Sequence, residues 1–95
     1  MSDLPEEDQD FAHSKLREAI DNQLASGEPA FAQSVLNKLL LVGYDREDAL
    51  DMMAIVLADE INALLEADRG FDMARYEQLL RQLPTLPDGT VVEVE

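Results

Sequence analysis

The 95-residue sequence contains no cysteine and only four glycines. Without cysteine, the chain cannot form a disulfide framework, a zinc ribbon or an iron–sulfur cluster, and it has no thiol nucleophile. The few glycines do not form the glycine-rich run of a phosphate-binding loop. There is one histidine, and Ser2, Ser14 and Ser34 lie in the N-terminal segment or within predicted helices, so no set of nucleophile, base and orienting group can be named. Catalysis is therefore the less favoured kind of function.

Basic residues are also scarce, because 7 Lys and Arg accompany 21 Asp and Glu, which gives a formal net charge of −14. This charge repels phosphate and so disfavours direct binding of nucleic acid or of an anionic membrane. No apolar run approaches the about 18 residues of a membrane-spanning helix. The N-terminal residues also lack the basic and apolar regions of a signal peptide. We expect a soluble, cytoplasmic protein of bacterial type.

The sequence does contain clear helical periodicity. Apolar residues recur at helical spacing in four segments: 9–26, 29–42, 45–68 and 73–83. Three glycines are predicted to end the first three helices: Gly27, Gly43 and Gly70. Asp72 is predicted to cap the fourth helix, with Phe71 and Tyr76 placed as a hydrophobic staple. The short loops favour antiparallel neighbours, so we predict an all-α fold, a compact four-helix bundle-like domain.

The two ends of the chain are predicted to lie outside this helical domain of residues 9–83. Residues 1–8 contain four acids and a proline, which predicts a flexible acidic arm. Residues 84–95 begin with a proline and contain the turn signal Asp88-Gly89 and one short valine-rich run. Because a lone strand has no partner, we predict an extended C-terminal tail.

Acidic residues are absent from residues 29–44, which contain a single base, Lys38. The predicted helix in this segment is apolar on more than one side, so it either lies at the centre of the bundle or faces a second chain. Burial at the centre is the favoured interpretation. The alternative is a homodimer interface or a partner groove, with four candidate residues: Phe31, Val35, Leu39 and Leu40.

Four acids share one side of the third predicted helix: Asp48, Asp51, Asp59 and Glu66. A solvated outer face is the favoured interpretation. The alternative is an electrostatic surface for a basic partner, or a mimic of nucleic acid that occupies a nucleic-acid-binding protein.

Two polar residues occupy apolar faces of predicted helices. His13 falls between apolar residues of the first helix and is more simply a satisfied core or boundary imidazole than a ligand. Glu60 falls among apolar residues of the third helix, where a carboxylate must be paired or protonated. Pairing of Glu60 with Arg17, Lys38, His13 or a helix end is favoured over catalysis.

Two motifs resemble a known family. Residues 13–24 read His-x-x-Leu-Arg-x-x-Ile-Asp-Asn-Gln-Leu, and residues 43–51 read Gly-Tyr-Asp-Arg-Glu-Asp-Ala-Leu-Asp. They resemble a small bacterial helical domain of unknown function, in which similar helices carry His-x-x-x-His before Glu-Asn-Gln, and Arg-His-Glu-Ala-x-His at the start of a later helix. The resemblance covers residues 11–65 and implies a helical fold without implying an activity.

The departures from that family pattern predict an ion pair. Of the four family histidines this sequence keeps His13, while Arg17, Glu47 and Asp51 occupy the other positions. Four imidazoles on neighbouring helices would suit a divalent metal, but the permanent cation of Arg17 repels one. We therefore hypothesise that Arg17 pairs with Glu47 or Asp51 and ties the first helix to the third. The alternative is a weak divalent-metal site of His13, Glu47 and Asp51 with Arg17 turned away; no other cofactor is expected.

Three functions remain as hypotheses from the sequence. The favoured one is a non-enzymatic protein-interaction or regulatory module that forms a homodimer or docks a protein partner through apolar surface on the second and third helices. The second is a metal-binding protein or metal-dependent enzyme that uses the degenerate His and carboxylate site. The third is an acidic mimic of nucleic acid.

Overall fold

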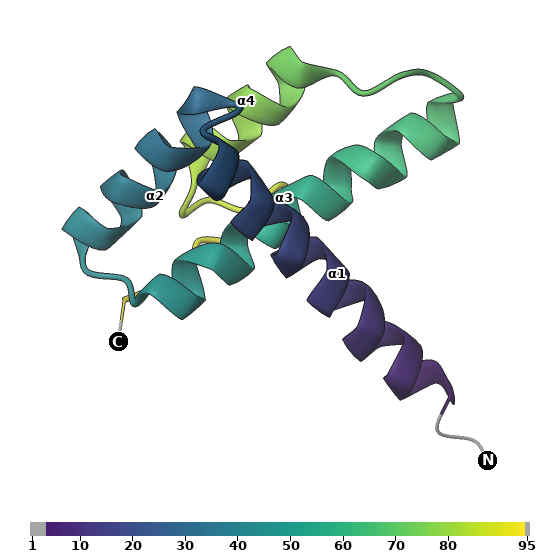
Figure 1. The fold of residues 1–95 in the computed structure, drawn as a ribbon, viewed down its shortest axis with the longest axis horizontal. Coiled ribbons are helices and arrows are strands. Elements are labelled where there is room, and N and C mark those ends of the chain that lie inside the picture. Colours follow the sequence, from purple (N-terminus) through teal and green to yellow (C-terminus); the bar gives the residue numbers. More distant parts are fainter. Residues whose placement is uncertain (1–3, 95) are drawn as a thin grey trace.

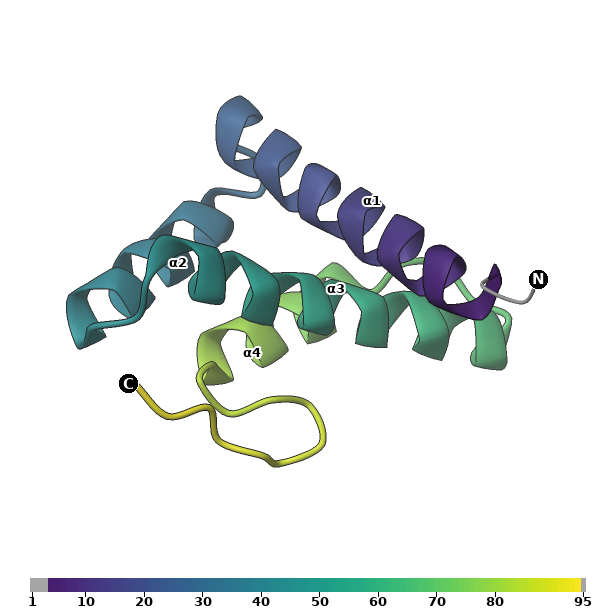
Figure 2. The same ribbon diagram turned by 90° about the horizontal axis from the view of Figure 1, so that it is seen from below.

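The computed structural model describes the backbone of residues 4–94 and the side chains of residues 12–94. This part of the chain forms four helices: α1 (Leu4–Ser26), α2 (Ala30–Val42), α3 (Arg46–Ala67) and α4 (Met73–Gln82). The central helix is α3, which contacts each of the other three (Figure 1). Figure 2 shows α1 on one side of α3, with α4 and the C-terminal loop on the other. The predicted all-α, four-helix fold is confirmed.

Two helix boundaries differ from the prediction. Helix α1 begins at Leu4, so residues 4–8 are helical and not part of an unstructured arm; residues 1–3 of that predicted arm lie outside the described residues. Proline is tolerated in the first turn of a helix, which is consistent with a helix that begins at Leu4. Helix α3 ends at Ala67, one residue before the predicted bound of 68, but the residue that ends it is Asp68 and not Gly70, because Asp68 adopts the left-handed conformation (φ 54°) and takes the capping position.

The core is built mainly from α2 and α3, and the burial of one side of α2 agrees with its acid-free, apolar sequence. Tyr76 of α4 is fully buried and contacts Phe31 and Phe71 edge-on, with ring centroids 5.8 and 5.3 Å apart. The Tyr76 hydroxyl donates to Gln23 Oε1 of α1 at 3.0 Å. Asp72 caps α4 through its side chain, which accepts a hydrogen bond from Arg75 N at 3.1 Å. Both the cap and the Phe71–Tyr76 staple are confirmed.

The C-terminal segment is not the extended, unpartnered tail that the sequence predicts. It turns at Asp88-Gly89 and pairs with itself, through an antiparallel bridge between Thr85 and Val91. Leu86 and Val92 pack against the core, and the Tyr44 hydroxyl donates to the Val92 carbonyl oxygen. The valine-rich run thus pairs with the short stretch that follows Pro84. That stretch is too short to show the alternating pattern of a strand in the sequence.

Within residues 4–94, no helix combines the length and the apolar character that crossing a bilayer requires.

Candidate functional site

An ion-pair cluster joins α1 to α3, as the motif departures predicted. Arg17 donates through Nη1 to Asp51 Oδ1 at 2.7 Å and through Nη2 to Glu47 Oε1 at 2.8 Å. The guanidinium is mostly buried, whereas Asp51 and Glu47 are 43 and 75 % exposed. Hydrogen bonds from Glu47 and then Asp51 raise the pKa of Arg17, despite the opposing effect of burial. The cation is therefore permanent, and it links the two helices.

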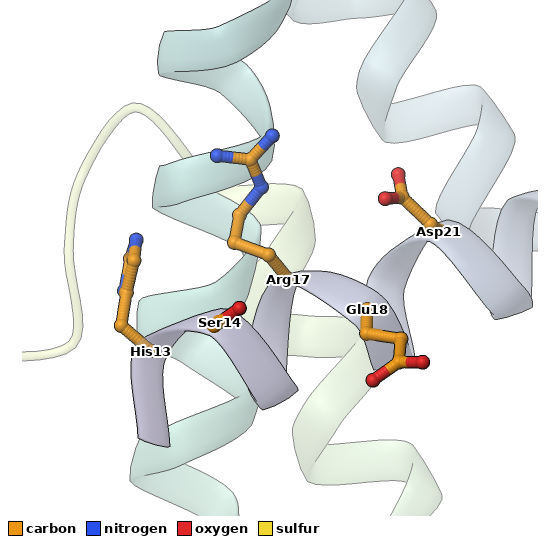
Figure 3. A pocket seen from close by; sticks show the side chains of 5 residues that line it. All are labelled: His13, Ser14, Arg17, Glu18 and Asp21. Atoms are coloured by element: carbon orange, nitrogen blue, oxygen red, sulfur yellow. The ribbon is translucent and has the colours of Figure 1, made fainter. Parts of the chain in front are cut away.

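His13 joins the edge of this cluster. In Figure 3, His13 and Arg17 extend from the same side of α1, whereas Glu18 points away. His13 Nε2 lies 3.1 Å from Asp51 Oδ1, and the ring is half exposed, so His13 is a boundary residue and not a core one. Among the described residues, no three His, Asp or Glu side chains are grouped so that they could hold a metal. A metal at His13, Glu47 and Asp51 would first have to displace Arg17 from both carboxylates.

Glu60 is fully buried and forms the centre of a second cluster. Its Oε2 accepts from Arg69 Nη1 at 2.8 Å and from Asp72 N at 2.7 Å, and its Oε1 accepts from Arg75 Nη1 at 2.7 Å. Arg69 Nη2 also donates to Oε1 at 3.2 Å. The hydrogen bonds from Arg69, Asp72 N and Arg75 outweigh burial and lower the pKa of Glu60 to about 2. Glu60 is therefore an ionised structural group that fixes the start of α4 on α3.

The predicted partners of Glu60 were wrong in part. Arg17, Lys38 and His13 all lie elsewhere, whereas the predicted helix end is correct, because Asp72 N belongs to the cap of α4. Sequence reasoning missed Arg69 and Arg75. The sequence did contain a signal for them. The loop after α3 and the first turn of α4 each carry an arginine, and both are near enough to Glu60 along the chain for the loop to bring them back to it.

The acids along α3 do not form a uniform solvated face. Asp51 is paired with Arg17, and Asp59 accepts from Arg75 Nη2 at 2.7 Å. Asp48 and Glu66 are exposed and make no ion pair within the described residues. This row, which we call the acidic row, consists of Asp48, Asp51, Asp59 and Glu66.

Six of the seven basic side chains bond to a polar partner within the chain, some of them at the surface. Lys38 Nζ donates to the Arg81 carbonyl oxygen at 2.8 Å. Five bases form ion pairs with carboxylates: Lys15, Arg17, Arg69, Arg75 and Arg81. The negative charge that remains uncompensated therefore faces outward, where a partner would meet it.

Of the four predicted interface residues, only one is substantially exposed. Val35 and Leu39 are 2 and 0 % exposed and belong to the core, and Phe31 packs on Tyr76. The correction follows from the arrangement of the helices, since α2 turns these residues toward α3 and α4. The exposed apolar surface of α2 lies at its C-terminal turn, in three residues: Leu40 (40 %), Leu41 (87 %) and Val42 (56 %).

A separate apolar groove of about 580 Å³ lies between α1 and α3. Six apolar side chains line it: Ala12, Leu16, Ala19, Leu57, Ala58 and Ile61. Lys15 and Asn62 are its polar lining residues. On the other side of Ala58 and Asn62 is a smaller hollow, which includes Asp59 and Asp88.

No protein-family model, no curated protein and no solved structure matches the chain significantly. The family resemblance of residues 11–65 stays a prediction from its motifs.

Proposed function

We propose that this protein is a non-enzymatic interaction module that self-associates through the outer face of α2. The observation that carries the proposal is the charge distribution on that helix: every exposed residue of α2 is uncharged. The outer face, which we call the α2 face, consists of Ala30, Gln33, Ser34, Asn37, Leu40, Leu41 and Val42. Such a surface is unusual in a chain of which 29 % is charged.

The charge of the protein indicates which partner fits the α2 face. Two copies with a formal net charge of −14 repel each other over most of their surfaces. Across a two-fold axis, two α2 faces can meet without placing one carboxylate of the helix against another. Leu41, which is 87 % exposed, would then be buried on both sides of the contact. A second copy of the chain is therefore the occupant that fits this surface.

Sedimentation velocity over a wide concentration range tests the proposal. We expect the wild-type protein to dimerise reversibly, and Leu41→Lys to raise the dimer Kd by about tenfold or more. The matched control is Leu65→Lys on α3, where another exposed leucine (69 %) lies away from the α2 face. A monomer at every concentration, or equal effects of the two substitutions, would overturn the proposal.

A further inference from the structure

We propose that the groove between α1 and α3 binds an amphipathic helix of another protein, with an apolar face toward the groove and a basic face toward the uncompensated carboxylates beside it, Glu66 and Asp88. This site is separate from the α2 face. It therefore does not depend on self-association.

The shape of the groove comes from small side chains at helical spacing. Ala12 and Ala19 on α1 and Ala58 on α3 leave room between the two helices, while Leu16 and Ile61 supply apolar walls. Residues 12, 16 and 19 lie four and three positions apart, so they share one face of α1. A partner helix with large apolar residues at the same spacing can place them in this space, as in other helix-in-groove complexes.

The charge beside the groove selects the partner. Asn62 lines the groove, and the acidic row continues on both sides of it along α3, with Asp59 before and Glu66 one turn after. Asp88 faces the adjoining hollow, and the backbone and side-chain hydrogen bonds of Thr90 lower the pKa of Asp88, so it is ionised at neutral pH. Glu66 and Asp88 have no cationic partner within the described residues. Lysine and arginine side chains on the outer face of a bound helix would supply the missing charge.

Charge also argues against occupation by the protein itself. In a second copy, α1 and α3 carry acids on their exposed faces and the exposed residues of α2 are uncharged, while the two arginines of α4 are already paired with carboxylates. An acidic helix placed over Asp59 and Glu66 would meet like charges, whereas α2 offers no base to pair with them except Lys38, which is already bonded to Arg81. A basic partner helix therefore fits this groove better than a second copy does.

A synthetic peptide tests the proposal directly. The probe is a helix-forming peptide of about 18 residues, with leucines on one face and lysines on the other. Two control peptides have the same leucine face with glutamates in place of lysines, or the same composition in scrambled order. Fluorescence anisotropy gives the affinity, and chemical-shift changes of backbone amides locate the bound peptide.

Protein variants separate the groove from general charge attraction. Ala58→Arg fills the groove, whereas Ala25→Arg adds the same charge at an exposed position on α1 outside it. We expect Ala58→Arg to weaken binding of the leucine–lysine peptide by about tenfold or more and Ala25→Arg by less than about twofold. Glu66→Gln should weaken binding by about two- to threefold, and raising the salt from about 50 to 300 mM should weaken it further.

The outcomes are distinct from those of the α2 proposal. Leu41→Lys should leave the peptide affinity unchanged, so a failure of self-association does not affect this test. The proposal is overturned if the scrambled or the leucine–glutamate peptide binds equally well, because recognition would then need no basic amphipathic face. It is also overturned if the leucine–lysine peptide does not bind, or if Ala58→Arg and Ala25→Arg weaken its binding equally.

Discussion

The carboxylate of Glu60 accepts a hydrogen bond at 2.7 Å from the backbone nitrogen of Asp72, the residue that caps α4. The buried Glu60 of α3 thus accepts from a backbone N–H at the beginning of α4, which has no acceptor within its own helix. The same carboxylate also accepts from Arg69 and Arg75. Glu60 therefore connects α3 both to the cap and to the first turn of α4, beside the ion pair between Asp59 and Arg75.

Removing that charge should destabilise the fold. We expect Glu60→Gln to lower the free energy of unfolding by about 2–3 kcal/mol, because Arg69 loses its anionic partner and Arg75 keeps only Asp59, while the shape of the side chain at position 60 is kept. Urea denaturation gives the measurement. The matched control, Glu66→Gln on the exposed side of α3, should change stability by less than about 0.5 kcal/mol. Equal effects of the two substitutions would contradict a structural role for Glu60.

The same group predicts a pH dependence. The folded pKa of Glu60 is about 2, below its ordinary value of 4.5, so the folded state favours the ionised form. The resulting stabilisation is fully present above pH 4.5 and is lost as the pH falls toward 2. Because protonated Glu60 resembles glutamine, the stability difference between wild type and Glu60→Gln should shrink over this range. A difference that stays constant from neutral to acid pH would contradict the assignment.

The two ion pairs of Arg17 should differ in strength. Double-mutant cycles with Arg17→Met should give a coupling of about 1 kcal/mol with Asp51→Asn and about 0.3 kcal/mol with Glu47→Gln. The reason is solvent screening, since Glu47 is 75 % exposed and Asp51 is 43 % exposed. A stronger coupling of Arg17 with Glu47 than with Asp51 would show that solvent exposure does not determine the strength of these two ion pairs.

Replacing the cation at position 17 should create a metal site. In Arg17→His, imidazoles at positions 13 and 17 would lie one turn apart on α1, facing Glu47 and Asp51 without a competing guanidinium. Isothermal titration should then show zinc binding that a further His13→Ala substitution removes. Micromolar zinc binding by the wild-type protein that is lost in His13→Ala would instead support the alternative metal site.

The hydroxyl of Tyr44 should hold the C-terminal loop in place. We expect Tyr44→Phe to lose the hydrogen bond to the Val92 carbonyl and to speed hydrogen exchange of the Leu86 and Val92 amides by about fivefold. Tyr76→Phe is the control, because it loses a hydrogen bond to Gln23 that lies away from the loop. If both substitutions affect the loop amides equally, Tyr44 has no local role there.

The sequence predicted the features that depend on local patterns. Helix periodicity, the Asp72 cap and the Phe71–Tyr76 staple involve residues a few positions apart, and the structure confirms them. The pairing of Arg17 with Glu47 and Asp51 of α3 was also predicted, because opposite charges stand at these positions of two short motifs.

Features that depend on tertiary geometry could not be predicted in this way. The partners of Glu60 come from a loop whose path no pattern fixes, and the C-terminal segment pairs over too few residues to show a strand period. The division of α2 into a buried side and an exposed turn required the positions of α3 and α4. Val35 and Leu39 stayed candidates for an interface beside the favoured burial in the core, because apolarity alone does not distinguish a core from a contact between chains.

The two tyrosines have a practical consequence. The chain has no tryptophan, so its ultraviolet fluorescence comes from Tyr44 and Tyr76 alone. One ring reports on the C-terminal loop, and the other on the centre of the helical core between Phe31 and Phe71. In Tyr44→Phe the emission comes from the core alone, and in Tyr76→Phe from the loop contact alone. Loosening of the loop and melting of the helices can therefore be recorded separately by fluorescence, without attaching a dye.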